Sequence, residues 1–425
     1  MPPLAASPDP EAIFALLQDR PGAVWLDGGL SATSGWSVLS WAPEEVVTDG
    51  ADWAATGRRL SGRGARGAAP FSGGCLGYVG FSAGHRVAPV PAQAPAPEPE
   101  VWLGRFPGGL CWDHAARRWH VGGTPGFCRD ARALLRRAAP LAPPEPPPST
   151  AAAWGGDQAA FEAGVRRVLA LIGAGDCYQV NLTRPVFVEG VGVPWPAWRR
   201  LRRRSSARYG AWLRLGPEQV VLSNSPELFL EVRGERVSSL PIKGTRPRHP
   251  DPDQDAALAR ALLDSEKDAA ELTMIVDLVR NDLGRIAAVG SVEAGPRTLT
   301  AHDNVFHTAQ RVSARLAPGR DAWDALAASF PPGSVTGAPK VQACRRIAEL
   351  EPAPRGVYCG AIGYVDQSGD ATWSVAIRTA LWDRGRVRYH VGGGVVADSD
   401  PRAEWVETVD KGTALAEAFT GAARL

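Results

Sequence analysis

The sequence predicts an α+β protein in which long antiparallel strand meanders carry helices on the outside. Three short runs rich in apolar residues, 209–215, 219–222 and 228–232, follow one another with Gly-Pro and Ser-Pro turns between them. This spacing is typical of consecutive antiparallel strands. The chain has 425 residues, of which 44% are hydrophobic, so it is long enough to bury a large core.

Outside those strands the pattern alternates between helices and further strands. Apolar residues recur at helical spacing over 161–172, and Gly173 and Gly175 end that segment. Asp400 followed by Pro401 is a good cap for a last helix. Helices are also predicted at 255–263 and 264–283, and strands at 357–365, 372–381 and 387–391.

Two proline-rich segments divide the first third of the chain. Residues 89–99 carry five prolines and residues 140–148 carry six. Proline cannot continue a helix or a central sheet ladder. We therefore predict an N-terminal region at 1–139, a linker at 140–150 and a second domain at 151–425.

Composition argues against several classes of function. The net charge is +2 and no basic stripe stands out, so nucleic acid is not an expected partner; the arginine-rich run at 199–204 is predicted to be a solvated helix face. No segment approaches the ~20 apolar residues of a membrane span, and the N-terminus lacks the features of a signal peptide. The six cysteines are scattered without a CxxC pair, which indicates a reduced cytoplasm and neither disulfides nor zinc.

The segment 240–247 places Lys243 between apolar Ile242 and flexible Gly244. Burial disfavours the ammonium form of a lysine, so its pKa falls toward neutral pH. A neutral amine can act as a nucleophile. Lys243 is therefore the first residue expected to carry chemistry.

Two predicted helices carry carboxylates at spacings that put them on one face. Asp268 and Glu271 are three residues apart, and Glu404, Glu407 and Lys411 occupy positions i, i+3 and i+7 of the last helix. Carboxylates from two helices suit a hard cation that keeps some waters, which describes Mg²⁺. A solvated helix face is the alternative for either group.

Other features suggest anion binding or proton transfer. Glycines 392–394 follow a predicted strand, and small residues fill the loop at 332–340 before a helix. Both expose backbone N–H groups, although a tight turn also explains the glycines. Arg378 is a charged residue in an apolar predicted strand. A half-buried arginine normally has a partner, and a carboxylate of the protein or of a ligand is the expected one. His307 is either a general acid/base or a satisfied core histidine.

Five longer motifs point to a known family: 240–247, 274–285, 333–340, 392–399 and 407–411. In this order they resemble the chorismate-binding family, which includes anthranilate, aminodeoxychorismate, isochorismate and salicylate synthases. The resemblance covers roughly residues 161–415, and residues 1–139 match the family's N-terminal region more loosely. It implies an anthranilate-synthase-component-I-like fold, in which large antiparallel β-sheets pack as a sandwich with helices outside, and it makes 151–425 the catalytic domain.

Lys243 and Gln179 indicate the branch of the family. Pro-Ile-Lys-Gly-Thr resembles the aminodeoxychorismate synthases, whereas anthranilate synthases carry alanine at the position of Lys243. Isochorismate and salicylate synthases carry a water-activating lysine where this chain has Gln179. The resemblance implies that chorismate and ammonia are converted to 4-amino-4-deoxychorismate, in 4-aminobenzoate and folate biosynthesis. Anthranilate synthase component I and a non-catalytic chorismate-binding subunit are the alternatives.

The resemblance also implies roles for individual residues. Lys243 adds to C2 of chorismate and expels the C4 hydroxyl, which Glu227 protonates. Ammonia then adds at C4 and expels the lysine. His307 completes the catalytic residues.

Metal and substrate ligands follow from the same resemblance. Glu271 and Glu407 bind Mg²⁺, which holds the ring carboxylate, and Glu404 is a further ligand, directly or through water. The residues implied to position the substrate are Gln179, Gly244, Thr245, Ser334, Tyr364, Arg378, Gly392, Gly393, Gly394 and Lys411.

The chain shows no complete glutaminase. The segment around Cys75 fits the Gly-x-Cys-x-Gly elbow of glutamine amidotransferases, but it continues into a glycine-rich strand. No His-x-Glu pair occurs in the chain to complete that triad. We therefore expect ammonia to come from solution or from a separate glutamine amidotransferase subunit, component II.

Overall fold

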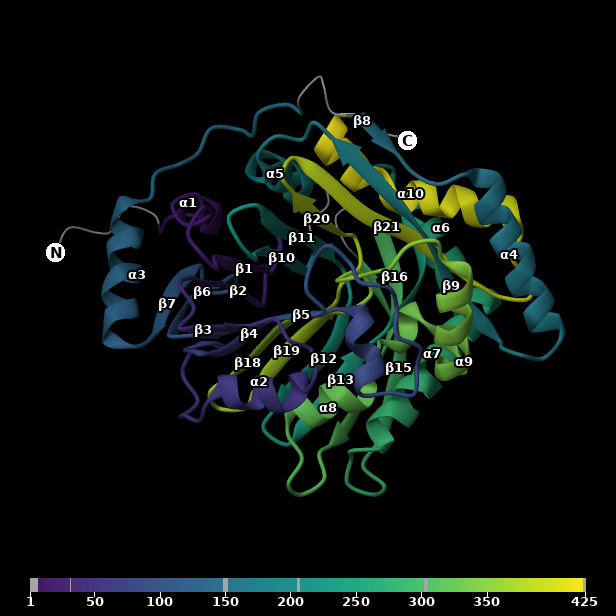
Figure 1. Ribbon diagram of the computed structural model, residues 1–425, viewed down its shortest axis with the longest axis horizontal. Coiled ribbons are helices and arrows are strands. Elements are labelled where there is room, and N and C mark those ends of the chain that lie inside the picture. The colour runs from purple at the N-terminus through teal and green to yellow at the C-terminus, as the bar shows by residue number, and fades with distance from the viewer. Residues whose placement is uncertain (1–6, 31, 148–151, 205–206, 302–304, 423–425) are drawn as a thin grey trace.

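The computed structural model describes residues 7–30, 32–147, 152–204, 207–301 and 305–422. Two large antiparallel sheets pack against each other, and helices lie over their outer faces (Figure 1). This arrangement confirms the predicted α+β class and the sandwich with helices outside.

The first sheet has 11 strands within the described residues. They are, in spatial order, β17 (Gly337–Ala338), β9 (Gln179–Glu189), β21 (Arg386–Val395), β20 (Thr379–Asp383), β11 (Gln219–Ser225), β10 (Tyr209–Arg214), β1 (Val24–Asp27), β2 (Trp36–Ser40), β6 (Gly108–Asp113) and β7 (Arg118–Gly123), with β8 (Ala152–Trp154) paired to β9.

The second sheet has 10 strands in the same described ranges. They are, in spatial order, β14 (Ile242–Pro247), β16 (Val305–Arg315), β13 (Arg236–Leu240), β12 (Leu228–Arg233), β19 (Ala371–Val375), β18 (Ala361–Asp366), β4 (Gly74–Val79), β5 (Val101–Phe106) and β3 (Glu45–Val47), with β15 (Glu293–Ala301) paired to β16.

Strands from the N-terminal region belong to both sheets. β1 pairs with β10, and β4 pairs with β18, each in antiparallel register. Segments on the two sides of the predicted linker therefore share both sheets. Residues 140–147 form neither helix nor strand, and residues 148–150 of that linker lie outside the described residues. The domain boundaries stay a prediction.

One apolar core lies between the sheets and two lie under the outer helices. Leu76 and Tyr78 of the second sheet pack with Ala211 and Leu213 of the first. The helices cover the outer faces with apolar stripes, as spacing predicts. They are α1 (Pro10–Phe14), α2 (Trp53–Ser61), η1 (Phe81–Arg86), α3 (Pro125–Arg137), α4 (Gln158–Gly173), α5 (Pro194–Arg204), α6 (Pro252–Leu263), α7 (Glu266–Gly284), α8 (Ala322–Ser329), η2 (Gly333–Val335), α9 (Lys340–Leu350) and α10 (Pro401–Thr420).

Most predicted elements are confirmed, with shifts at their ends. The helix expected from Asp264 begins at Glu266, because Ser265 caps it by accepting a hydrogen bond from the Asp268 N–H. The strand expected at 372–381 is wrong: it is two strands, β19 and β20, which lie in different sheets. The segment that connects β19 to β20 includes Ala376, which is fully buried between the sheets. Because this segment is as apolar as the two strands, the amino-acid composition did not reveal where the first strand ends.

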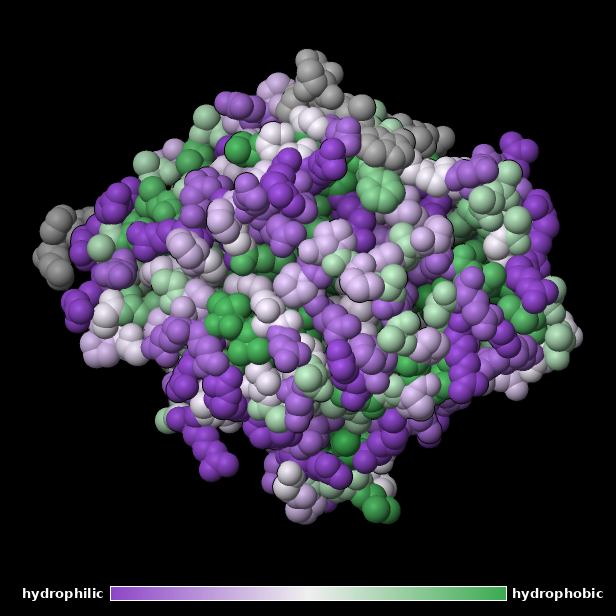
Figure 2. Space-filling view, viewed as in Figure 1, coloured by the Kyte–Doolittle hydropathy of each residue, from purple (hydrophilic) through white to green (hydrophobic). Residues whose placement is uncertain are grey.

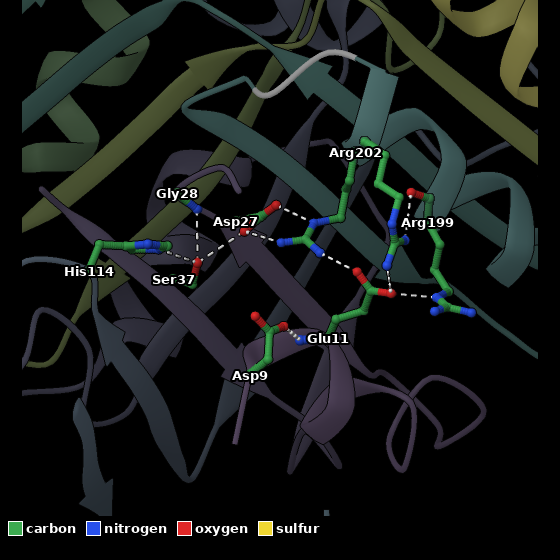
Figure 3. Close-up of polar contacts among 9 residues, drawn as sticks. Asp9, Glu11, Asp27, Gly28, Ser37, His114, Arg199 and Arg202 are labelled. Carbon is green, nitrogen blue, oxygen red and sulfur yellow. Dashed lines mark hydrogen bonds and ion pairs between the residues drawn. The ribbon is translucent and has the colours of Figure 1, made fainter. Parts of the chain in front are cut away.

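The prediction of a solvated arginine face at 199–204 is confirmed for Arg203 and Arg204, which are exposed, but is wrong for Arg199 and Arg202. Arg202 is 3% exposed and lies between two carboxylates, with Nη1 2.8 Å from Glu11 Oε2 and Nε 2.6 Å from Asp27 Oδ2 (Figure 3). Arg199 Nε also donates to Glu11, at 2.5 Å. The partners come from α1 and β1, far away in sequence, so the local charge pattern did not reveal them. This buried network ties α5 to the N-terminal region.

The surface shown in Figure 2 is a mixture of polar and apolar residues over the face drawn in Figure 1. Among the described helices, none is long and apolar enough to cross a bilayer.

Candidate active site

Lys243 lies on β14 at an irregularity in the strand. The register between β14 and β16 shifts between Lys243 and Thr245, because Gly244 adopts φ +71°, a left-handed conformation that glycine reaches without strain. A Cβ on Gly244 would lie 2.9 Å from Asp268 Cγ. The Thr308 hydroxyl donates to the Lys243 carbonyl at 2.6 Å. These constraints place the lysine as the sequence predicts, on a tight segment of backbone.

The surroundings of Lys243 lower its pKa on balance. Burial lowers the pKa of Lys243 because the ammonium group loses hydration, and Lys411 adds to that lowering. Glu271, Glu227 and Glu407 act in the opposite direction, so these carboxylates gather around the same amine. The net lowering increases the fraction of amine available for nucleophilic attack at neutral pH.

Glu227 is a buried acid in the turn between β11 and β12, and its carbonyl accepts a hydrogen bond from the N–H of Val375 on β19. Its side chain is 6% exposed. Burial raises the pKa of Glu227 to about 7, against the opposing effects of the bonded Ser334 hydroxyl and of Lys243 and Lys411. An acid with a pKa near the working pH is suited to proton transfer. Ser334 on η2 is thus brought to Glu227, as expected for the site.

Gln179 and Gly394 meet beside Lys243. A Cβ on Gly394 would lie 2.5 Å from Gln179 Nε2 and 3.6 Å from Lys243 Nζ. Gln179 is fully buried, and neither of its side-chain polar atoms bonds any described residue. A buried amide without partners is costly, so a ligand that bonds Gln179 would remove that cost.

His307 lies on β16 opposite Thr245. Its ring is 4% exposed, with Nδ1 3.0 Å from Thr245 Oγ1 and 3.3 Å from the Gly244 carbonyl. The histidine therefore contacts the two residues that follow Lys243. Its predicted catalytic role stays a prediction.

The predicted metal ligands come from α7 and α10. Burial raises the pKa of Glu271 and that of Glu404, and Glu407 adds to both shifts by like-charge repulsion. Burial acts to raise the pKa of Glu407, but Lys411, together with Lys243 and Lys267, outweighs it and the pKa is lowered. Lys411 Nζ lies 2.5 Å from Glu407 Oε1. Ser399 donates to Glu404 at 2.6 Å.

These carboxylates fit a cation in chemistry and in space, although no group of three His, Cys, Asp or Glu side chains in the described ranges is already arranged to hold one. Mutual repulsion among carboxylates is the condition that a hard cation relieves. Gly393 supplies room: a Cβ there would lie 2.8 Å from Glu404 Oε2 and 3.3 Å from Glu407 Oε1.

Glycines 392–394 lie inside β21 and do not form a loop after a strand, which corrects the prediction from sequence. β21 pairs with β9 through all three glycines, whereas its register with β20 ends at Tyr389. The Gly392 carbonyl accepts a hydrogen bond from Lys411 Nζ at 3.0 Å. In an extended strand the N–H of a residue points to the same side as its carbonyl, so the Gly392 N–H faces the side of Lys411.

Arg378 lies in the connection between β19 and β20, at φ +50°, and not within a strand as predicted. Burial lowers its pKa, and no described side chain forms an ion pair or hydrogen bond with its guanidinium. A half-buried arginine without a protein carboxylate is a candidate for binding a carboxylate of a ligand.

Tyr364 does not join this group, and its assignment as a substrate residue is wrong. Its ring packs between the sheets at 5.5 Å from the ring of Phe71, and its hydroxyl accepts a hydrogen bond from Thr372 at 3.1 Å. Residues of a strand alternate between faces, and position 364 faces the inter-sheet core around Leu76.

The structure instead brings the turn 357–360 toward Glu227, which the sequence reasoning missed. Burial raises the pKa of Cys359 to about 12, and Glu227 is among the charges that add to the shift. The adjacent Tyr358 is 6% exposed, and Cys359 adopts φ +63°. Flanking Gly356 and Gly360 are the sequence signal that this segment is a turn.

Cys75 is fully buried within β4. Burial raises its pKa far above the usual range of a thiol. The surroundings of Cys75 are those of an inert core cysteine and not of a nucleophile on an exposed elbow.

Comparison with known proteins identifies the family. A family described as chorismate binding enzyme matches residues 16–417. The chain therefore belongs to the chorismate binding enzyme family, as the motifs predict.

The relatives lie in two branches of that family. The chain is 41% identical to aminodeoxychorismate synthase component 1 of Klebsiella aerogenes, over 80% of this chain and 76% of that protein. It is 38% identical to anthranilate synthase component 1 of Streptomyces coelicolor, over 81% of this chain and 72% of that protein. The crystal structure of anthranilate synthase component I from Streptococcus pneumoniae superposes with a TM-score of 0.79 at 28% identity, covering 91% of this chain and 93% of that chain. The expected fold is thereby confirmed.

Proposed function

We propose that this chain is component I of an aminodeoxychorismate synthase, which converts chorismate and ammonia to 4-amino-4-deoxychorismate for 4-aminobenzoate and folate biosynthesis. The observation that carries the proposal is the half-buried, pKa-lowered Lys243, which lies next to Gly394 and Gln179. The aminodeoxychorismate synthase relative at 41% identity supports the same branch.

The first half-reaction uses Lys243 and Glu227. The neutral Lys243 amine adds to C2, the two conjugated double bonds of the ring both shift toward C4, and the C4–O bond breaks with its electron pair. Glu227, with a pKa of about 7, gives its proton to the departing hydroxyl, which leaves as water. A covalent intermediate divides one difficult displacement into two easier steps.

The second half-reaction reverses the attachment. Ammonia forms a bond to C4, the two conjugated double bonds shift back, and the C2–N bond to Lys243 breaks with its electron pair returning to the amine. One proton of the new ammonium group passes to the Glu227 carboxylate, so both residues regain their starting states.

We assign the orientation of the substrate to the other charged and polar groups of the candidate site. Arg378 and Lys411 supply positive charge for the two carboxylates of chorismate, and the Gly392 N–H lies on the same side as Lys411. Glu271, Glu407 and Glu404 would hold Mg²⁺, which when bound neutralises the ring carboxylate. The alternative product is anthranilate, which the Streptomyces coelicolor relative supports.

A product assay separates the candidates. The purified chain is incubated with chorismate, MgCl₂ and ammonium salt, with and without an aminodeoxychorismate lyase. The proposal expects 4-aminobenzoate only when the lyase is present. Fluorescent anthranilate would assign the chain to the sister branch, and no consumption of chorismate would leave it as a binding subunit.

A further inference from the structure

A small pocket, with room for about one water-sized molecule, lies behind the proposed catalytic acid. Glu227 and Ser334 form part of its wall, and Asp282 and Ser329 form another polar part. The remaining wall includes the apolar side chain of Val279. The pocket therefore connects the acid to the region where α7 and α8 pack together.

One hydroxyl in this pocket has no partner in the protein. Ser329 is 2% exposed, and its Oγ forms no hydrogen bond with any residue in the described part of the chain. Buried polar atoms are nearly always satisfied. A small polar molecule in the pocket would satisfy this one.

At the end of the pocket formed by Asp282, the charges favour a neutral molecule over a cation. The Asp282 carboxylate is bonded by Lys340 Nζ at 2.6 Å and by Arg285 Nη2 at 3.2 Å. Arg285 also donates to the Ala328 carbonyl, next to Ser329. Because two cations surround one carboxylate, an additional ammonium ion is disfavoured there, whereas a neutral amine can accept and donate hydrogen bonds.

We propose that this pocket binds ammonia behind Glu227 and delivers it to C4 of the substrate. This inference rests on the proposed function. The bonds change as in the second half-reaction: the ammonia nitrogen bonds to C4, the C2–N bond to Lys243 breaks, and one proton of the new ammonium group passes to Glu227. Ser329 is a positioning residue that holds ammonia through its hydroxyl, and Val279 limits the size of the amine.

The first test separates ammonia binding from the rest of catalysis. Ser329→Ala removes the hydroxyl and Val279→Phe fills the pocket from a half-buried position. Each is expected to raise the KM for ammonia about tenfold, with the KM for chorismate and the yield of Lys243 adduct formed without ammonia unchanged. Ser238→Ala is the matched control, because Ser238 is also buried, on β13, but its hydroxyl accepts a hydrogen bond from Arg311 and the residue does not line the pocket.

A second substitution of Val279 changes the pocket volume in the opposite direction. Val279→Ala enlarges the pocket, so the ratio of kcat/KM for methylamine to that for ammonia is expected to rise about tenfold. If folded Ser329→Ala and Val279→Phe both keep the wild-type KM for ammonia, or if Val279→Ala leaves the amine preference unchanged, the pocket assignment is overturned. A wild-type chain that makes no aminated product would overturn the proposed function itself, which the unmutated sample reports separately.

Discussion

Gly394 on β21 and Lys243 on β14 face each other from the two sheets, so that a Cβ on the glycine would lie 3.6 Å from the lysine Nζ. The contact joins β14, the first strand in the order of one sheet, to β21, the third strand in the order of the other. It depends on the absence of a side chain at position 394 and on the left-handed Gly244 that follows the lysine. The candidate site is therefore formed by strands of both sheets and not by one motif.

The first prediction concerns that contact. Gly394→Ala places a methyl group 2.5 Å from Gln179 Nε2, so Gln179 or the lysine has to move. We expect kcat for chorismate amination to fall at least about 100-fold, because small misplacements of reacting groups cost that much. Gly173→Ala on α4, where a Cβ meets nothing within 4 Å, is the control. Steady-state kinetics and thermal melting check both variants, and equal rates for the two would contradict the prediction.

The second prediction concerns Glu227 as an acid. Because its pKa is about 7 in the folded chain, the protonated form is lost above that pH, and kcat is expected to fall there. Glu227→Gln should lower kcat at least about 100-fold and remove this limb of the pH profile. A Glu227→Gln enzyme with the wild-type pH profile would exclude Glu227 as the acid.

The same pKa has a consequence for stability. The folded-state pKa of Glu227 lies above its ordinary value of 4.5, so its contribution to stability is complete below about pH 4.5 and is lost as pH rises through about 7. Glu227→Gln is therefore expected to raise Tm relative to the wild type by at least about 2 °C at about pH 8 and to have less effect under acidic conditions. Calorimetry under both conditions measures the change in Tm that Glu227→Gln causes. For an acid whose pKa is lowered by folding, the same substitution would lower Tm at the higher pH.

The third prediction concerns the carboxylates. Glu271→Gln or Glu407→Gln is expected to abolish turnover in saturating ammonia, or to raise the half-saturating Mg²⁺ concentration at least about tenfold, while circular dichroism stays that of the folded chain. Glu266→Gln, an exposed residue at the start of α7, is the control. Near-normal activity of either site variant at ordinary Mg²⁺ would remove that residue from the metal site.

The fourth prediction concerns the source of nitrogen. The pure chain is expected to use ammonia but not glutamine, and to gain glutamine-dependent activity when an amidotransferase subunit is added. Cys75→Ala should leave ammonia-dependent activity unchanged, since the thiol is buried in β4. Turnover of glutamine by the pure chain, lost in Cys75→Ala, would show a glutaminase within it.

Features that depend on local sequence pattern or on family motifs could mostly be predicted from the sequence. Apolar periodicity located the helices, and motif order located Lys243, Glu227 and Gln179, which the structure brings together. The helices and the proximity of these three side chains could be predicted because each rests on a short segment whose conformation is set by its own residues, such as Gly244 at φ +71°; the roles of the three residues stay predictions.

The sequence failed where partners come from distant segments. Tyr364 and Tyr358 are both near glycines, and only the alternation of β18 shows that Tyr364 faces the inter-sheet core. The local sequence predicts that Arg202 is a surface charge, whereas the structure pairs it with Glu11 and Asp27 (Figure 3). Arg378 lies in a connection that is as apolar as the strands it joins.

The fifth prediction concerns the nucleophile. Lys243→Ala removes the amine but keeps the carboxylates proposed to bind metal and the groups proposed to bind the substrate carboxylates. We expect formation of 4-amino-4-deoxychorismate to fall at least about 100-fold, with chorismate binding largely kept. Some anthranilate is also expected, because the segment then reads Pro-Ile-Ala-Gly-Thr. Product analysis by liquid chromatography checks both outcomes.

The most direct test of the covalent mechanism is peptide mass spectrometry of the wild-type chain trapped with chorismate and Mg²⁺ in the absence of ammonia. The account predicts a chorismate-derived adduct on the peptide that contains Lys243, formed before any product and discharged when ammonium is added. No adduct on Lys243, together with wild-type rates of amination by Lys243→Ala, would contradict it.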